Sequence, residues 1–208
     1  MELFVPEMYR NIVDNYGFEA LAYDTIRQVF YTTTENVLTT DGSPSTPYYP
    51  VQGKLRIQSF SSDLKPLKQY IYMLDAPLSK TLGRSIVHGV TAMTALPDGR
   101  LVVLEREANI TKTYNKSKVW NKLYLVDLNE FDKQMTVSWD EPVLKKTLLS
   151  QWQTCFKLGD SSFANYEGMC LGRPTADGRM TLILLSDSQG GYGFGPVHLS
   201  DYIRVIAF

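Results

Sequence analysis

The sequence lacks an excess of charge of either sign, a long apolar run and a basic N-terminal leader. Its 208 residues include 21 Lys and Arg against 22 Asp and Glu, which leaves a formal net charge of −1. Such a balanced chain does not offer the basic surface that binds nucleic acids or anionic membranes. Apolar runs stay below the roughly 18 residues that span a bilayer, and residues 1–10 lack the basic-then-apolar pattern of a signal peptide. The composition predicts no nucleic-acid partner and no membrane span.

Cysteine and several catalytic signatures are also scarce. The only two cysteines, Cys155 and Cys170, make neither a disulfide framework nor a zinc site. We interpret both as ordinary buried thiols, with one disulfide between them as the alternative. No Gly-x-Ser-x-Gly segment is present, which disfavours a serine-hydrolase triad. The Gly-rich segment 190–195 lacks the spacing of a phosphate-binding loop and is interpreted as a surface loop.

What the sequence does contain is an internal repeat. Each copy has a short apolar segment, a turn, a β-branched run and an acidic residue at its end. Aligning Glu19, Thr91 and Glu167 gives periods of 72 and 76 residues. Such self-similarity indicates a repeat architecture. The turns Asp98-Gly99 and Asp177-Gly178 between apolar runs are typical of β-hairpins.

An antiparallel hairpin brings the start of its first strand beside the end of its second strand. The repeat is therefore expected to carry its acidic residues to one rim of the molecule. The expected neighbours are Glu19 with Glu35, Thr91 with Glu105 and Arg106, and Glu167 with Asp187.

Eleven strands are expected, in three groups. They are 18–23, 28–34, 54–60 and 69–74; 89–96, 100–105, 122–128 and 142–149; and 166–172, 179–186 and 202–208. Residues 1–15 contain one or two expected helical turns. The longest loops, 39–47, 107–118 and 189–196, join the second and third strands of each copy.

These strands predict an all-β fold of the β-propeller type. About three four-stranded antiparallel blades, at about 15–75, 87–150 and 163–208, make one domain over 1–208. The third copy lacks its outer strand, which we expect to come from the N-terminal segment or from a part outside this sequence. A two-sheet sandwich of about eleven strands is the alternative.

Propellers ordinarily contain four to eight blades, so three do not close a ring. We favour the C-terminal part of a longer protein whose N-terminal half completes the ring. A homo-oligomer that completes the ring, or an open array of sheets, are the alternatives.

The charged segments of the repeat resemble those of the phytase-like esterase family. They are Gly17-Phe18-Glu19-Ala20-Leu21-Ala22, Leu104-Glu105-Arg106-Glu107, Asn165-Tyr166-Glu167-Gly168-Met169 and Ser186-Asp187. The resemblance implies a propeller-type domain, hydrolysis of small ester or phosphoester substrates, and an extracytoplasmic location, periplasmic or secreted. Two positions depart from the family pattern: Thr91 stands where the other copies have Glu, and Ala20 replaces the usual Gly.

The clustered acids indicate the chemistry expected at the rim. Converging carboxylates repel one another unless a proton or a cation lies between them, and calcium favours six to eight oxygen ligands. Such an ion can polarise an ester or phosphoryl oxygen, and a free carboxylate can act as general base. The predicted calcium ligands are Glu19, Glu167 and Asp187. The predicted catalytic residues are Glu19, Glu105, Glu167, Asp187 and His88, and the predicted substrate-binding residues are Arg106, Asn165 and Glu35.

Plainer interpretations compete with this one. Acids at strand ends commonly cap turns, Glu105 and Arg106 can pair with each other, and His88 is more often an ordinary loop or core residue. At the level of function, the alternatives are a calcium-dependent lactonase-like hydrolase and a non-catalytic propeller whose rim binds a protein or a glycan.

Overall fold

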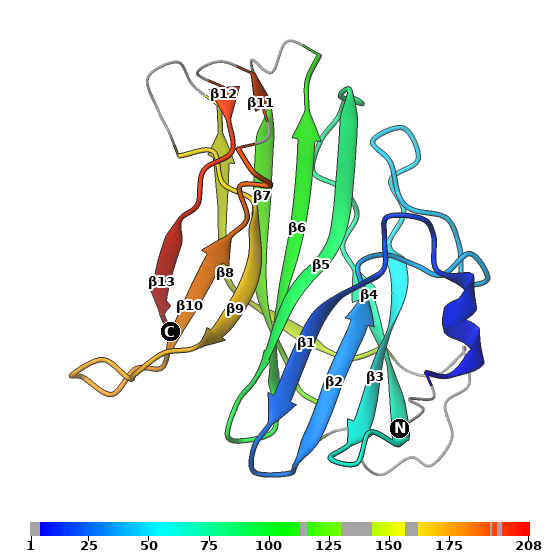
Figure 1. The fold of residues 1–208 in the computed structure, drawn as a ribbon, viewed down its shortest axis with the longest axis vertical. Coiled ribbons are helices and arrows are strands. Elements are labelled where there is room, and N and C mark those ends of the chain that lie inside the picture. Colours follow the sequence, from blue (N-terminus) through cyan, green and yellow to red (C-terminus); the bar gives the residue numbers. More distant parts are fainter. Residues whose placement is uncertain (1–4, 113–115, 130–142, 157–161, 192, 195–196) are drawn as a thin grey trace.

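Three antiparallel sheets stand side by side in the computed structural model (Figure 1). The structure describes residues 5–112, 116–129, 143–156, 162–191, 193–194 and 197–208. Over these residues the fold is all-β apart from one short 3-10 helix, η1 (Glu7–Asn11). No helix among these residues is long and apolar enough to cross a membrane.

The first two sheets have four strands each, in sequence order. The first contains β1 (Phe18–Asp24), β2 (Val29–Thr34), β3 (Gly53–Ser61) and β4 (Pro66–Leu74). The second contains β5 (Ser85–Ala95), β6 (Leu101–Ile110), β7 (Lys118–Val126) and β8 (Lys146–Cys155).

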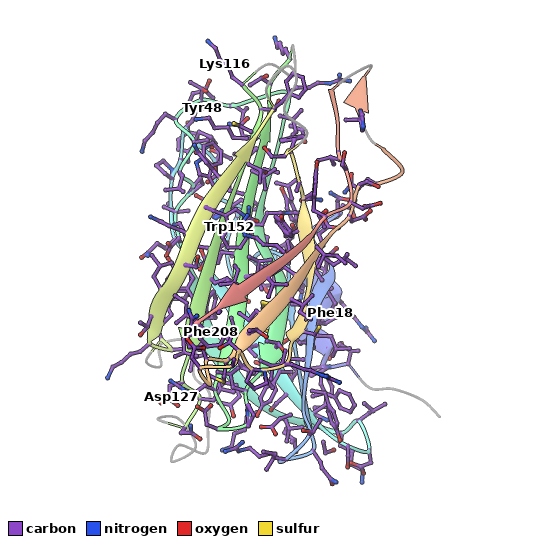
Figure 2. The ribbon with its side chains drawn as sticks, turned by 90° about the vertical axis from the view of Figure 1, so that its left-hand side faces the viewer. Phe18, Tyr48, Lys116, Asp127, Trp152 and Phe208 are labelled. Carbon is purple, nitrogen blue, oxygen red and sulfur yellow. The ribbon has the colours of Figure 1, made fainter. Side chains whose placement is uncertain are left out.

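The third sheet is smaller. Its order is β13 (Ile203–Ala207), β10 (Thr181–Ser186) and β9 (Tyr166–Leu171). A separate two-stranded ribbon joins β11 (Gly193–Phe194) to β12 (Val197–His198). Figure 2 turns this side of the molecule toward the viewer.

Two hydrophobic clusters fill the spaces between consecutive sheets. Alternate residues of a strand point to opposite faces of its sheet, and β6 follows this rule. Leu101 and Val103 of β6 belong to the cluster shared with the first sheet, whereas Val102 and Leu104 belong to the cluster shared with the third. The middle sheet is therefore covered on both faces.

The first strands of the three sheets lie next to one another, in the order β1, β5, β9 (Figure 1). The amide of Val90 in β5 donates to the carbonyl of Glu35, 2.9 Å away. The hydroxyl of Thr91 in β5 donates to the carbonyl of Tyr166 in β9 over 3.1 Å. These bonds tie β5 to the residue that follows β2 on one side and to β9 on the other.

The all-β prediction and the expectation of three antiparallel sheets of three or four strands are confirmed. The two-sheet sandwich is excluded by the three separate sheets. The described sheets do not close into a ring, so the propeller stays a prediction. Residues 5–17, the described part of the N-terminal segment, supply no strand to the third sheet. Tyr9 of η1 packs against Phe18 of the first sheet, with ring centroids 4.9 Å apart.

Several boundaries were predicted wrongly. The segment 107–118 was expected to be a loop, but β6 continues to Ile110 because its pairing with β5 extends to Ser85. The strand expected over 142–149 runs from Lys146 to Cys155 as β8; position 142 lies outside the described residues. The loop expected over 189–196 contains β11, while residues 192, 195 and 196 lie outside the described part.

Both cysteines are free thiols, as the favoured interpretation predicted. The expectation that both are buried is wrong, because Cys155 is only partly buried and Cys170 is exposed.

Candidate functional site

A β-bulge occupies the same position in each inner strand. The hairpin register shifts at Glu19 in β1, at Thr91 in β5 and at Glu167 in β9. These are the residues that the internal repeat aligns. A bulge leaves one residue unpaired and re-aims its side chain, and bulges are enriched beside active sites. The repeat therefore marks one shared structural position at the end where β1, β5 and β9 meet.

Arg106 of β6 lies at the centre of a polar cluster at this end. Its Nη2 donates to Oε1 of Glu35 over 2.5 Å, and its Nη1 donates to Oε1 of Glu167 over 2.6 Å. Nη1 also donates to Oδ1 of Asn165, whose amide nitrogen in turn donates to Glu167 over 2.7 Å. We call Glu19, Glu35, Arg106, Asn165 and Glu167 the Arg106 cluster.

The cluster is deep on one side and open on the other. The side chains of Glu35 and Arg106 are 4% and 6% exposed, whereas that of Glu167 is 25% exposed. Glu19 lies at the surface. A small molecule approaching from solvent would reach Glu19 and Glu167 before Glu35.

Glu35 is the most perturbed acid of the cluster. Burial raises the pKa of Glu35 to about 7, with a further upward contribution from Glu19, although Arg106 opposes the shift. Burial and the charge of Glu167 also raise the pKa of Glu19. A carboxyl with a pKa near neutrality can both accept and release a proton under ordinary conditions.

Gly89 makes room for Glu35 between the first and second sheets. It pairs with Arg106 in the β5–β6 ladder. A Cβ atom at this glycine would lie 2.1 Å from the carbonyl oxygen of Glu35 and 2.5 Å from its Cγ. Only a residue without a side chain allows this approach. Gly89 thus positions Glu35 against the guanidinium.

Asp187 joins the cluster through its backbone, not through its carboxylate. The amide of Asp187 donates to the carbonyl of Asn165 over 2.8 Å. The carboxylate is exposed and accepts from the amide of Gln189 over 2.7 Å, as a turn-capping Asp does.

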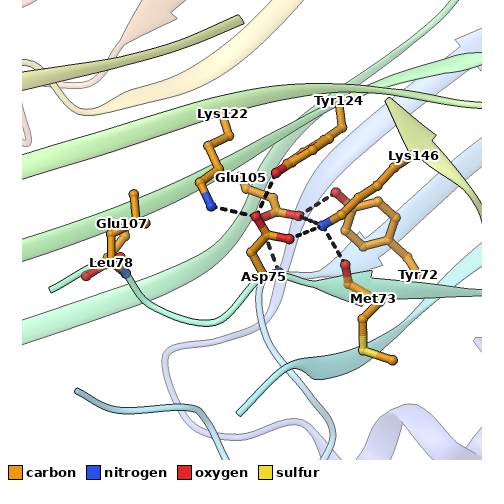
Figure 3. A network of polar contacts seen from close by, with 9 residues as sticks. All are labelled: Tyr72, Met73, Asp75, Leu78, Glu105, Glu107, Lys122, Tyr124 and Lys146. Carbon is orange, nitrogen blue, oxygen red and sulfur yellow. Dashed lines mark hydrogen bonds and ion pairs between the residues drawn. The ribbon is translucent and has the colours of Figure 1, made fainter. Parts of the chain in front are cut away.

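Glu105 and Arg106 are neighbours in β6, so their side chains point to opposite faces of the sheet. Glu105 belongs to a second network (Figure 3). The phenol of Tyr72 and the ammonium of Lys146 each donate to Glu105 Oε1 over 2.6 Å. Lys146 also donates to Asp75 over 2.7 Å, and Lys122 donates to Asp75 over 2.5 Å. With Tyr124, whose hydroxyl donates to Asp75 over 2.6 Å, these residues make up the Asp75 network.

The Asp75 network is a compensated set of buried charges. Burial raises the pKa of Glu105 despite the opposing charge of Lys146. For Asp75, burial acts upward, but hydrogen bonds from Lys122, Lys146 and Tyr124 outweigh it and lower the pKa. Buried ion pairs of this kind hold a structure in one arrangement, and removal of one partner is strongly destabilising. Its chemistry suits a structural role between the first and second sheets.

His88 faces the Asp75 network and not the Arg106 cluster. It is buried, its Nδ1 has no hydrogen-bond partner among the described residues, and it pairs with Glu107 in the β5–β6 ladder. Burial lowers the pKa of His88 to about 4, so its imidazole is neutral at pH 7. The carboxylate of Glu107 accepts from the amides of Leu78 and Ser79.

The structure thus brings together five of the predicted site residues and separates three others. Glu19, Glu35, Arg106, Asn165 and Glu167 share one cluster, while Asp187, Glu105 and His88 lie apart from it by their side chains. The sequence analysis missed the Asp75 network. The sequence gives one signal of this network: Lys122 and Tyr124 are two residues apart in an expected strand and therefore share one of its faces.

A family model for phytase-like proteins, described as esterase-like activity of phytase, matches residues 1–189. The chain belongs to the phytase-like family. This description indicates a hydrolase with esterase-like activity. No curated protein and no solved structure matched the chain.

The phytase-like chain was predicted to hold calcium, and its donor atoms allow a test of fit. Among the described residues, no group of three or more His, Cys, Asp or Glu side chains is arranged to hold a metal ion. Of the three predicted calcium ligands, Glu167 is paired with the Arg106 guanidinium, and the carboxylate of Asp187 accepts from the amide of Gln189 instead of joining the cluster. The described carboxylates do not by themselves make up a calcium site, and calcium stays a prediction.

Proposed function

We propose that the Arg106 cluster is the site at which this phytase-like chain hydrolyses ester bonds, with Glu35 as the general base. Hydrolysis needs a group that takes a proton from water as the water attacks the carbonyl or phosphoryl centre. Glu35 is suited to this because its carboxyl combines burial, a fixed position against Arg106 and a pKa of about 7. This combination is the observation that carries the proposal.

The other members of the cluster would serve the substrate. Glu167 is the more exposed of the two acids paired with Arg106, so a substrate oxygen can exchange with it at the guanidinium more readily than with Glu35. Once freed, the planar guanidinium offers hydrogen bonds to a developing oxyanion. Asn165, which already contacts both Arg106 and Glu167, would hold the guanidinium in place during that exchange.

The charge of the cluster favours neutral substrates. Three carboxylates and one guanidinium have a formal charge of −2 when all are ionised, which repels a phosphoester anion. A neutral carboxylic ester meets no such barrier. Hydrolysis of the predicted phosphoester substrates would therefore need added positive charge at the cluster. We propose that a divalent cation such as calcium supplies this charge.

Three expectations accompany the proposal. We propose that the three sheets are blades of a β-propeller, that the whole protein is extracytoplasmic, and that further blades come from a longer chain or from a partner. The first is supported by three repeated sheets with adjacent inner strands. The second rests on the family resemblance alone.

The test compares hydrolysis of a neutral aryl acetate and an aryl phosphodiester, each with added calcium and with a chelator. Glu35→Gln is expected to lower kcat for the acetate by roughly 10²–10⁴-fold, the usual contribution of a general base. Glu7→Gln, which changes an exposed acid on η1, is the matched control. Full acetate activity in Glu35→Gln would reject the assignment. Phosphodiester activity that survives the chelator would reject the role of the cation.

Glycan binding is the second candidate function, favoured by a pocket of about 350 Å³ on β7 and β8. It is lined by Leu78, Trp120, Asn121, Lys122, Gln151, Trp152 and Gln153. Aromatic rings with neighbouring amides suit a sugar ring and its hydroxyls. If this is the function, Trp120→Ala abolishes binding on a glycan array, whereas Glu35→Gln leaves it unchanged.

A further inference from the structure

The two terminal sheets expose residues at positions that are core in the middle sheet. The bulges fix the alignment of the repeats. Leu185 pairs with the residue just after the bulge of β9, and Leu104 pairs with the residue just after the bulge of β5, so these two leucines are equivalent. Across the ladder, Ile203 pairs with Leu185 as Leu123 pairs with Leu104. Leu104 and Leu123 are completely buried, but Leu185 and Ile203 are 52% and 71% exposed.

We call this side of the third sheet the trailing face, and it includes Leu185, Ile203 and Val205, the last 62% exposed. The strands that carry it, β10 and β13, lie toward the viewer in Figure 2. In the middle sheet the equivalent face packs against the third sheet. Three large aliphatic side chains on one exposed sheet face are typical of an interaction surface.

The first sheet has the opposite exposed side, which we call the leading face. It includes Leu21 and Tyr23 of β1, 66% and 40% exposed, and Phe30 of β2, whose ring centroid lies 4.4 Å from that of Tyr23. By the same alignment Leu21 is equivalent to Met93, which is buried against the first sheet. The 3-10 helix η1 packs beside this face, with Tyr9 on Phe18, and Leu21 stays open.

Both interfaces inside the chain join a trailing face to a leading face. Ala20, Ala22 and Tyr31 of the first sheet pack against the second in one cluster, and Ala92, Val102 and Leu104 of the second pack against the third in the other. The chain therefore exposes one unpaired surface of each kind. Inside the chain, every trailing face that is covered packs on a leading face, so the two exposed faces match each other.

We propose that a second copy of this chain covers these surfaces, the trailing face of each copy packing on the leading face of the other. Two such contacts related by a twofold axis close a dimer and leave neither face exposed, as closed symmetric assemblies do. The occupant is a second copy because the chain itself carries the complementary face. The proposal does not depend on the hydrolytic role of Glu35.

The test measures the mass of the full chain in solution by light scattering over a range of concentrations. The wild-type protein is expected at twice the chain mass of 23.6 kDa. Leu21→Asp and Ile203→Asp each place a charge on one face and are each expected to halve that mass. Tyr49→Ser, a change at an exposed aromatic in the loop before β3, is expected to leave the dimer intact. Circular dichroism verifies that each variant is folded.

Mixing the two face variants tests the pairing of unlike faces. Leu21→Asp keeps a normal trailing face and Ile203→Asp keeps a normal leading face, so the mixture is expected to form a heterodimer through one intact contact. A wild-type monomer at all concentrations would overturn the proposal. A Leu21→Asp variant that dimerises as the wild type does would also overturn it, because the trailing faces would then pair with each other.

Discussion

Glu35 couples the stability of the protein to pH. Its pKa is raised from 4.5 to about 7 by burial, so the folded state binds its proton more tightly than the unfolded state does. Its contribution to stability is full below pH 4.5 and is lost as pH rises through about 7. The lost contribution is about 3 kcal/mol, at 1.36 kcal/mol for each pKa unit.

We expect Glu35→Gln to remove this dependence. The difference in free energy of unfolding between variant and wild type, measured by urea titration at several pH values, should grow in favour of the variant from pH 4.5 to 7. The burial of His88 works in the opposite sense, since its lowered pKa makes stability fall as pH drops from 6.5 towards 4. Because both proteins contain His88, its effect cancels in the difference. A constant difference would contradict the raised pKa of Glu35.

Arg106 is expected to be the most sensitive residue of the cluster. Arg106→Met removes the cation between Glu35 and Glu167 and leaves a buried carboxylate without its partner. Such a loss costs about 3–5 kcal/mol. Urea unfolding at pH 8.5, where Glu35 is ionised in the wild type, should show this loss, and at pH 5.5 the loss should be smaller because Glu35 is then protonated in both proteins. An equal loss at both pH values would indicate that packing, not charge, dominates.

At the scale of the strand, the close approach of β5 to Glu35 predicts a contrast between two glycines in equivalent positions. Gly89→Ala brings a Cβ against the Glu35 backbone and is expected to destabilise by about 1–3 kcal/mol, as overpacking does. Gly17 holds the matching place before the bulge of β1 and has no heavy atom within 4 Å of such a Cβ. Gly17→Ala is expected to change stability by less than about 0.5 kcal/mol. If thermal melts show the same loss of stability for Gly89→Ala and Gly17→Ala, the close approach of β5 to Glu35 does not determine the effect.

The sequence predicted the hairpins and their shared end because hairpin geometry is local. It aligned Glu19, Thr91 and Glu167, and all three proved to be bulge residues. It grouped Glu105 with Arg106 because both end a strand, although the two-residue period of β6 sends them to opposite faces.

The Asp75 network escaped the sequence because its members come from separate elements. Asp75 follows β4 and Lys146 begins β8, and they meet only when the first and second sheets pack. The start of β8 depends on its pairing with β7 and is not visible in local periodicity. Contacts between sheets, unlike turns, therefore had to come from the structure.

At the scale of the whole molecule, each sheet is stabilised mainly by its neighbour, so the two uncovered faces should affect global stability. If a second copy covers them, unfolding is coupled to dissociation and the midpoint Tm depends on protein concentration. A roughly hundredfold increase in concentration adds about 2.7 kcal/mol per dimer, which corresponds to a rise in Tm of about 3–5 °C for chains of this length. Calorimetry of the wild type should show this rise, and Leu21→Asp should have a Tm independent of concentration. A wild-type Tm that does not change with concentration would mean that the three sheets are stable with both faces exposed to water.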